Sequence, residues 1–408
     1  MINKPVASLA EARRRAGYSQ EQLAERLDVE ASTVGRWERR RTTPQPWVRP
    51  RLAQALGLSL DELAEILSRQ PVAPVGTRSP QDHPASMSPI DDVRAISVRS
   101  PVPRSIGWTE VEHVQITTQA VATSENLFGG GLSCAAAMGQ LSWAAGLLEV
   151  RASSEVRKAM FNAVGNLANV AAYSAFDIAD YDAAEHSFRF ALWCADQSGS
   201  WSLRANTLAE MSRKATHLGQ LDDAISLIEF AQVRRDRLTA TARAMLWTLR
   251  ANLLALTGRH SEAQTDVDRG DAEFAQQDPA ADPPWLCYYD TAEHQGSTGK
   301  ALIPVALALN QPEMSAHRLE AAVRLHSNMY PRSRTFSRIR LAGVLMATGD
   351  PHQAAEIGRQ AVRDAASLRS RRIVAELRGL DRRSERHARL GDVAELRNDI
   401  AVLVRSAA

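Results

Sequence analysis

A short pattern of small residues recurs through the C-terminal three quarters of the chain. A small turn residue is followed five positions later by a small helical residue, as in Ala179 and Ala184. The pattern returns about every 40 residues, and its turn residues are Ala179, Gly219, Gly258, Asn310, Gly349 and, in a weaker copy, Gly391. Each copy predicts a hairpin whose first helix ends at the turn residue and whose second helix starts within three residues. One hairpin cannot bury its apolar face alone, so the repeats predict an α-solenoid of stacked hairpins.

The composition favours an all-α chain of more than one domain. The 408 residues are 44% hydrophobic but only 5% aromatic, a balance that favours helix over sheet. Composition and residue periodicity divide the sequence into a compact zone at 1–67, a Pro- and Ser-rich zone at 68–105 and a helical zone at 106–408. The middle zone lacks the apolar residues needed for a core, so we expect a flexible linker. Thr109 and Glu112 predict a capping box that opens the first helix of the third zone.

The interval between Gly258 and Asn310 is longer than the others and contains an insert. Residues 282–290 concentrate aromatic side chains in an otherwise aromatic-poor chain. Two interpretations remain open. The insert either plugs the solenoid core where the repeat period stretches, which we favour, or forms one wall of a ligand site.

The first zone contains two short helices at the spacing of a helix-turn-helix. The first helix ends before a turn at Asp28-Val29, and the second covers about residues 31–39. The apolar residues spaced to bury the inside corner of this pair are Leu23, Leu27, Val29, Val34 and Trp37. Two predicted capping boxes open the second and the last helix of the zone, Ser19 with Gln22 and Ser59 with Glu62.

This zone resembles the XRE, or Cro-type, DNA-binding domain of phage repressors over about 60 residues. The resemblance is carried by Arg13-x-x-x-Gly17-Tyr18-Ser19-Gln20-x-x-Leu23-Ala24-x-x-Leu27-x-Val29, by Thr33-Val34-x-x-Trp37-Glu38 and by Leu52-x-x-Ala55-Leu56-x-Leu58-x-Leu60-x-x-Leu63. It implies a five-helix, lambda-repressor-like fold whose second motif helix enters the major groove of double-stranded DNA. It also implies an internal ion pair between the residues matching Arg13 and Glu38.

The same resemblance implies which residues bind DNA. By position these are Gln20, Ala31, Ser32, Thr33, Arg36, Arg39, Arg40 and Arg41. Among them, Ala31, Ser32 and Arg36 are expected to face base edges, and Gln20, Arg39 and Arg41 to contact phosphates. Asp28 and Arg40 stand at positions where the family customarily has glycine.

The C-terminal hairpins resemble tetratricopeptide repeats with longer helices than usual, over roughly residues 131–404. In such repeats, positions 13, 10, 6 and 3 before the turn residue face the concave surface. Those positions carry polar residues in three successive hairpins, and the candidate ligand groove comprises Asn166, Asn169, Tyr173, Asn206, Arg213 and Asn252. Asparagine both donates and accepts hydrogen bonds and is disfavoured inside helices, which indicates a binding role. The alternative is an ordinary polar, solvated helix face.

The combined layout predicts a sequence-specific transcriptional regulator. It resembles peptide-sensing quorum regulators and actinobacterial XRE regulators that carry repeats. The resemblance implies a homodimer whose repeat domain binds a peptide or small-molecule effector that controls DNA binding. The rival hypothesis is a DNA-tethered adaptor whose repeats bind a partner protein and no small ligand.

Other chemistry is not expected from this sequence. The Gly296–Lys300 string is a fragment of a phosphate-binding loop that lacks the required glycine and hydroxyl positions, and we interpret it as a loop opening a helix. The histidines show no metal-ligand spacing, no catalytic triad motif is present, and no cofactor is expected. Cys134, Cys194 and Cys287 are far apart and are predicted to be reduced thiols. Because no catalytic motif is found, we expect that the protein is not an enzyme. The sequence shows no signal peptide and no membrane-spanning segment, so we expect a cytoplasmic protein that does not engage a membrane.

Overall fold

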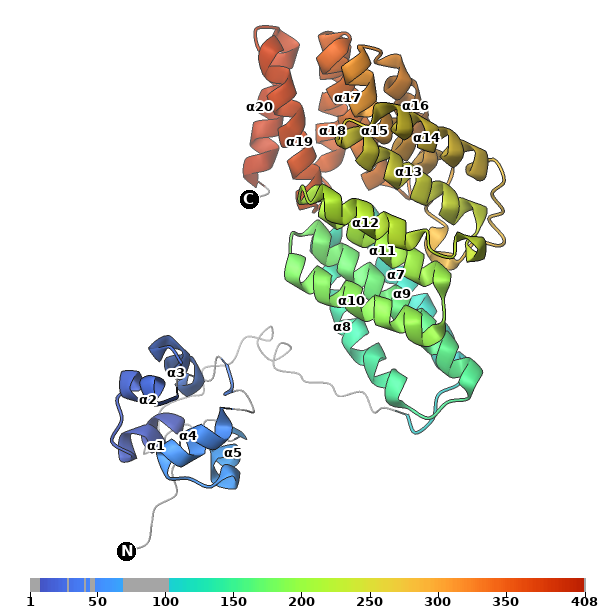
Figure 1. The fold of residues 1–408 in the computed structure, drawn as a ribbon. Helices are drawn as coiled ribbons and strands as arrows, with labels where there is room; N and C mark the ends of the chain where they lie inside the picture. Colours follow the sequence, from blue (N-terminus) through green and yellow to red (C-terminus); the bar gives the residue numbers. More distant parts are fainter. Residues whose placement is uncertain (1–7, 28, 40–41, 45–47, 69–102, 407–408) are drawn as a thin grey trace, which may run out of the picture. The chain divides into compact units, whose positions relative to one another are not determined.

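The computed structural model describes residues 8–27, 29–39, 42–44, 48–68 and 103–406 (Figure 1). These residues fall into two compact units, one within 1–97 and the other within 98–408. The all-α prediction is confirmed, because the described residues form 19 α-helices and no β-strand. No helix among them is long and apolar enough to cross a membrane.

The N-terminal unit consists of five short helices around one small core. They are α1 (Leu9–Arg15), α2 (Gln20–Leu27), α3 (Ala31–Glu38), α4 (Arg49–Leu56) and α5 (Leu60–Ser68). The predicted inside corner is confirmed, since Leu23, Leu27, Val34 and Trp37 are at most 5% exposed and Val29 packs against them. The core is completed by Leu9 and Ala12 from α1, Leu52, Ala53 and Leu56 from α4, and Leu63 and Ile66 from α5.

Both capping boxes of this unit form as the sequence predicts. The Ser19 hydroxyl accepts from the Gln22 N–H at 3.1 Å, and the Gln22 side chain accepts from the Ser19 N–H at 2.8 Å. Ser59 and Glu62 repeat this exchange at 3.1 and 2.8 Å. Each box satisfies two backbone donors that the helix itself leaves without a partner. The two boxes fix where α2 and α5 begin.

The repeat unit begins with two helices that precede the predicted hairpins, α7 (Trp108–Phe128) and α8 (Gly130–Ala145). The capping box expected at Thr109 and Glu112 is wrong, because α7 starts earlier and Glu110 accepts from the Gly107 N–H at 2.6 Å. Just before α7, Ser105 forms an isolated β-bridge with Arg151. Ser105 is the last residue of the predicted linker, and this bridge joins it to the repeat unit. The linker prediction otherwise falls on 69–102, outside the described residues.

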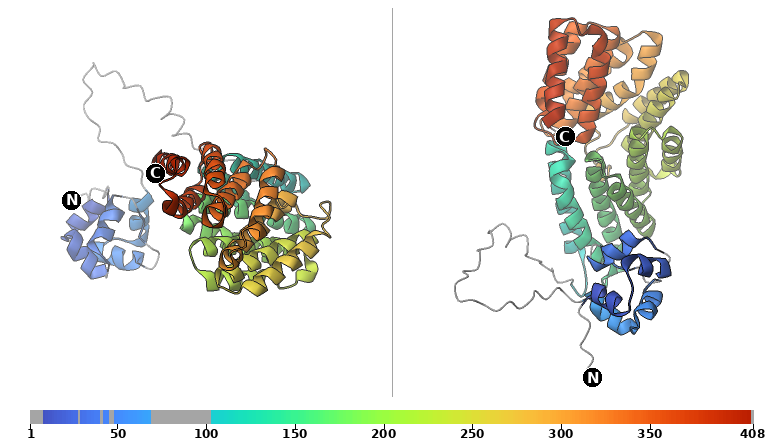
Figure 2. Two further views of the ribbon diagram at one scale, coloured as in Figure 1. Left: turned by 90° about the horizontal axis from the view of Figure 1, so that it is seen from above. Right: turned by 90° about the vertical axis from the view of Figure 1, so that its left-hand side faces the viewer.

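Six helical hairpins follow and pack side by side in chain order (Figures 1 and 2). They are α9 (Ser154–Asp177) with α10 (Tyr181–Ser198), α11 (Trp201–His217) with α12 (Leu221–Ala231), α13 (Ala240–Leu256) with α14 (His260–Phe274), α15 (Thr291–Leu309) with α16 (Glu313–Leu325), α17 (Pro331–Thr348) with α18 (Pro351–Ala365), and α19 (Arg371–Ser384) with α20 (Gly391–Ser406). First helices of neighbouring hairpins also contact one another, which is the arrangement of a solenoid.

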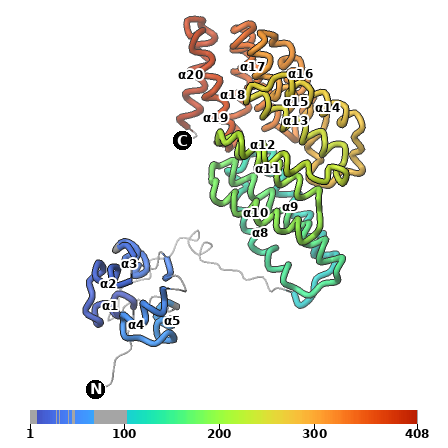
Figure 3. Tube along the Cα trace, viewed as in Figure 1, coloured from blue at the N-terminus to red at the C-terminus, as the bar shows by residue number. Residues whose placement is uncertain are grey.

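Figure 3 traces the chain through these hairpins. In four of them the turn residue has the conformation that the repeat pattern predicts. Ala179, Gly219, Gly258 and Asn310 have φ of 65°, 76°, 79° and 53°, the left-handed conformation that ends a helix. Gly349 has φ of −116° instead. The small residues five positions later, Ala184, Ala224, Ala263, Ser315 and Ala354, are all fully buried, which confirms that they let the paired helices approach closely.

The Gly296–Lys300 string is part of a helix, which corrects the prediction of a loop. It lies inside α15, and a Cβ on Gly299 would stand 2.9 Å from the Leu319 side chain. Thr298, within the string, is fully buried. The glycines therefore serve the packing of α15 against α16, and the string has no phosphate-binding geometry.

Candidate functional site

Helix α3, the predicted recognition helix, presents a polar face opposite its buried one. Val34 and Trp37 point into the core, whereas Ser32 and Arg36 are exposed. The Arg36 guanidinium donates to the Thr33 hydroxyl at 2.9 Å, and the Ser32 hydroxyl donates to Glu30 at 3.2 Å. An exposed arginine held along a short helix is suited to base edges in the major groove.

Arg13 and Glu38 join the first and third helices, as the resemblance implies. The Arg13 Nε atom lies 2.6 Å from the Glu38 carboxylate, and these side chains are 12% and 7% exposed. Arg13 also donates to the carbonyl of Tyr18 at 2.6 Å. The Gln20 amide donates to the same carboxylate, so its amide nitrogen is engaged within the domain. An Arg-carboxylate pair with this many partners fixes α3 against α1 and α2.

The remaining predicted DNA-binding residues lie at the ends of α3. Ala31 is the first residue of the helix, and the exposed Arg39 follows its last residue. Arg40 and Arg41 lie outside the described residues.

Five of the six candidate groove residues line one cavity in the repeat unit. They are Asn166, Asn169 and Tyr173 on α9 and Asn206 and Arg213 on α11. The cavity has a volume of about 220 Å³ and is also bounded by α7, the insert and the start of α17. A protein cavity of about 150 Å³ holds a molecule the size of benzene, so this one has room for a small ligand.

The polar atoms on the cavity wall are incompletely paired. The Oδ1 atoms of Asn162, Asn166, Asn169 and Asn206 are buried and have no hydrogen-bond partner among the described residues. The same holds for Glu210 Oε2 and for two nitrogens of Arg213. Buried polar atoms are nearly always hydrogen-bonded in native proteins, and each unpaired one costs about 1–3 kcal/mol. The buried polar atoms without hydrogen-bond partners thus gather on the wall of one cavity.

Two predicted groove residues differ from the others. Asn252 is 6% exposed but does not line the cavity. Tyr173 lines it, yet its hydroxyl already accepts a hydrogen bond from Arg372 at 2.5 Å. Tyr173 is therefore held in place by the protein itself, while the asparagines are not.

The insert combines the two interpretations that the sequence left open. Tyr289 is 2% exposed and donates to Thr248 at 3.1 Å, and Tyr288 donates to the Met245 sulfur at 3.2 Å, so the insert packs on α13 as a plug. At the same time Trp285 and Tyr288 line the cavity. The insert therefore both packs on α13 and forms part of the cavity wall.

Several cavity residues escaped the sequence analysis. Asn162 lies one helical turn before Asn166, so helical spacing from the predicted residues could have found it. Glu125 and Arg332 also line the cavity, but they belong to α7, which is outside the repeat pattern, and to α17, whose contact with α7 no spacing rule predicts.

The charged residues on the cavity wall are shielded from water. Glu210 and Arg213 form an ion pair at 3.3 Å and are 8% and 17% exposed. Burial raises the pKa of the Glu210 carboxyl, against the opposing attraction of Arg213. Burial opposes the charged form of Arg213, but Glu210 and neighbouring groups outweigh it and raise the pKa of the guanidinium. Arg213 therefore stays charged and can offer hydrogen-bond donors to an occupant.

The described residues include three cysteines and no cluster of metal-ligand residues. No group of three or more His, Cys, Asp or Glu residues there could hold a metal ion. Cys194 is fully buried, Cys134 partly buried and Cys287 exposed at the cavity, and all three are free thiols.

Comparison with known proteins bears on the N-terminal unit. No curated protein matches the chain. Residues 6–66 match a protein family described as a helix-turn-helix domain. That range spans α1 to α5 almost to its end and includes the recognition helix with Arg36. The N-terminal unit is thus similar to a helix-turn-helix domain in sequence and in the number of its helices, and this similarity supports a DNA-binding regulator.

Proposed function

We propose that this regulator is controlled by a small polar effector, a short peptide or a metabolite, that binds in the cavity between α7, α9, α11 and α17. One observation carries the proposal: buried polar atoms without hydrogen-bond partners converge on a single cavity, and they belong to Asn162, Asn166, Asn169, Asn206 and the ion-paired Glu210 and Arg213. Both donors and acceptors are present, so the effector carries both kinds of group, as an amide or a peptide bond does.

The cavity serves binding rather than catalysis in this proposal. Asparagine amides do not titrate, so they hold a ligand through hydrogen bonds without exchanging protons with it. Each new hydrogen bond contributes about 0.5–1.5 kcal/mol net, and four of them correspond to a change in Kd of roughly one and a half to four orders of magnitude. The asparagines alone could thus separate a micromolar ligand from one that does not measurably bind.

The N-terminal unit supports XRE-type recognition by a homodimer. Its helix α3 has only eight residues, so one copy reaches few base pairs. Proteins with a helix-turn-helix of this size usually bind two half-sites one helical turn apart. We propose that the repeat unit supplies the contact that pairs two copies.

Two experiments on the full-length protein test the proposal. Sequencing the fragments that it retains from sheared genomic DNA is expected to yield one recurring paired motif. Thermal unfolding is then followed in a library of amino acids, short peptides and polar metabolites. An effector present at 100 times its Kd stabilises the folded protein by about 2.7 kcal/mol. If no compound stabilises it while a partner protein does, the effector proposal is wrong and the adaptor hypothesis replaces it.

A further inference from the structure

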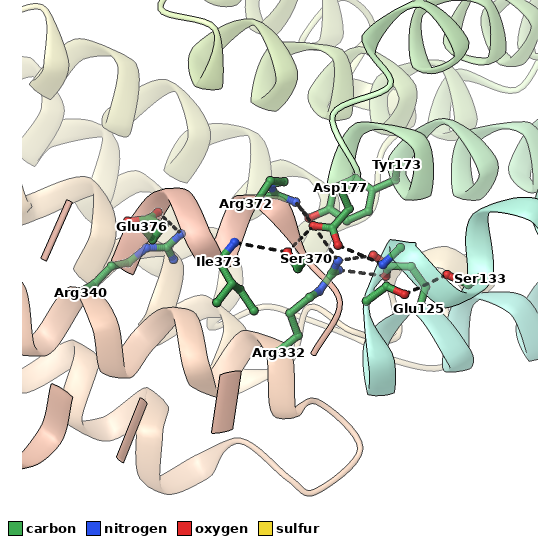
Figure 4. Close-up of polar contacts among 12 residues, drawn as sticks. Glu125, Ser133, Tyr173, Asp177, Arg332, Arg340, Ser370, Arg372, Ile373 and Glu376 are labelled. Carbon is green, nitrogen blue, oxygen red and sulfur yellow. Dashed lines mark hydrogen bonds and ion pairs between the residues drawn. The ribbon is translucent and has the colours of Figure 1, made fainter. Parts of the chain in front are cut away.

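The two ends of the repeat unit contact each other across a long stretch of sequence (Figure 4). The backbone N–H of Arg369, just before α19, donates to the carbonyl of Phe128 at 2.8 Å, and the N–H of Gly131 donates back to the carbonyl of Arg369 at 3.0 Å. The right-hand view of Figure 2 shows the teal helix of this N-terminal end reaching the red C-terminal helices. We call this the closure contact; its residues are Glu125, 128–131 and Asp177 on one side and Arg332 and 369–372 on the other.

The closure contact leaves no room for side chains at its centre. A Cβ on Gly129 or Gly131 would stand 2.7 or 2.8 Å from atoms of Arg369, and one on Gly130 would stand 2.4 Å from the carbonyl of Ser174. These are distances that real Cβ atoms do not adopt. The three consecutive glycines therefore permit a backbone-to-backbone fit. Closely packed interfaces of this kind are either joined or separated, with no continuous range between.

Buried charges complete the contact. Asp177 is fully buried and accepts from the Gly130 N–H at 3.0 Å and from the Ser370 hydroxyl at 2.8 Å. Arg332 pairs with both oxygens of Glu125 and lies 3.4 Å from Asp177. Separating the two ends would break the Glu125–Arg332 ion pair and the Ser370–Asp177 hydrogen bond, so these contacts favour the joined state.

The cavity and the closure contact share residues. Glu125 and Arg332 line the cavity and also pair with each other across the closure contact. Tyr173 lines the cavity and accepts a hydrogen bond from Arg372, on the far side of the contact. The cavity wall thus includes α7, α9 and α11 from one end of the unit and the start of α17 from the other, so it is complete only when the ends are joined.

We propose that an occupant of this cavity holds the closure contact shut, so that the repeat unit reports the occupant as a change between joined and separated ends. An occupant that touches both ends binds the joined state better, and a ligand shifts an equilibrium by its difference in affinity for the two states. Thermodynamic reciprocity then requires that joining the ends tightens binding. The inference rests on the proposed function only for the identity of the natural effector. Its mechanical part, the coupling between an occupied cavity and joined ends, is independent of that identity.

Cys287 allows the mechanical part to be tested in the full-length protein. Its thiol is exposed and lines the cavity. Burial raises the pKa of Cys194 to about 12 and also raises the pKa of Cys134, so both react slowly. Benzyl methanethiosulfonate would therefore attach a benzyl group through a disulfide at Cys287. The methyl reagent, which adds almost no bulk, is the matched control, and Cys287→Ser shows any labelling elsewhere.

The readout is amide hydrogen exchange at Gly131 and Arg369, followed by mass spectrometry. We expect several-fold slower exchange in the benzyl-labelled protein and no change with the methyl label. Ser370→Ala, which removes a hydrogen bond to Asp177, is expected to speed exchange at Gly131. Ser370 also caps α19, so Ser200→Ala, which removes the equivalent cap of α11, controls for lost capping.

Unchanged or faster exchange in the benzyl-labelled protein overturns the inference. Equal exchange at Gly131 in Ser370→Ala and Ser200→Ala overturns the assignment of the closure contact. Neither result depends on finding the natural effector. If the tethered group slows exchange but no library compound binds, the coupling stands and only the proposed effector function fails.

Discussion

Arg332 at the start of α17 and Glu125 near the end of α7 form a buried, two-pronged ion pair between residues 207 positions apart in the chain. Their side chains are 8% and 6% exposed. We expect Arg332→Ala to lower the unfolding free energy of the repeat unit by about 3–5 kcal/mol, because it leaves buried carboxylates without their partner. Urea unfolding measures this change. Arg397→Ala, which breaks the more exposed pair with Asp381, is the matched control and should cost less than about 1 kcal/mol. Equal losses of unfolding free energy in the two variants would show that the buried pair stabilises the protein no more than the exposed pair does.

Stability should depend on pH through Glu125. Burial, despite the attraction of Arg332, raises the pKa of its carboxyl from 4.5 to about 7. The folded state therefore binds a proton that the unfolded state has already released between these two values. It follows that this residue contributes stability at low pH that is lost as the pH rises towards and through about 7. Relative to Glu125→Gln, the wild type should lose stability over that interval. Parallel pH profiles for the two proteins would contradict the assignment.

Among the described residues, Arg36 offers the most direct test of DNA recognition. We expect Arg36→Ala to weaken binding to the preferred site by about 1–3 kcal/mol and to relax the preference at one base pair in each half-site. Arg36→Lys keeps the charge but loses the planar fork of donors, so it should retain nonspecific affinity and lose the preference. Titration of matched and single-base-changed duplexes at fixed salt separates the two effects. If Arg36→Ala leaves both affinity and preference intact, α3 does not read the groove through this residue.

The Arg13–Glu38 pair should stabilise the N-terminal unit. Arg13→Ala leaves the Glu38 carboxylate, only 7% exposed, with the Gln20 amide as its remaining side-chain donor. We expect a loss of up to about 3–5 kcal/mol, seen as faster amide exchange in α1 and α3 of the full-length protein. Arg15→Ala, on the exposed side of the same helix, should change exchange little. Similar exchange in both variants would rule out a stabilising role for the pair.

Local sequence signals predicted the hairpins and the helix-turn-helix well, because their determinants are close together in the chain. Ala179 and Asn310 mark helix ends through their left-handed backbone, and the Ser19 and Ser59 boxes fix helix starts. Asn166, Asn169, Asn206 and Arg213 could be placed in the cavity because their distance from the turn residue sets the face of the helix on which they lie.

The misplacement of Asn252 and the missed role of glycines 129–131 depend on contacts between distant segments, whereas the errors at Thr109 and at 296–300 concern local helix boundaries. The insert packs over α13, where its tyrosines contact Met245 and Thr248, and Asn252 on the same helix does not reach the cavity. Glycines 129–131 had no interpretable signature in the sequence, since their partner Arg369 lies far along the chain. Periodicity within a segment carries no information about which distant segment will cover it.

The most direct test of the account measures whether the cavity controls DNA binding. The affinity of the full-length protein for its genomic site is measured with and without each library compound, for the wild type, for Asn166→Ala/Asn206→Ala and for Asn398→Ala, an exposed asparagine on α20. The account predicts a compound that shifts the affinity of the wild type and of Asn398→Ala by about tenfold, or 1.4 kcal/mol, and leaves the double variant unaffected. A compound that shifts all three proteins equally would contradict it.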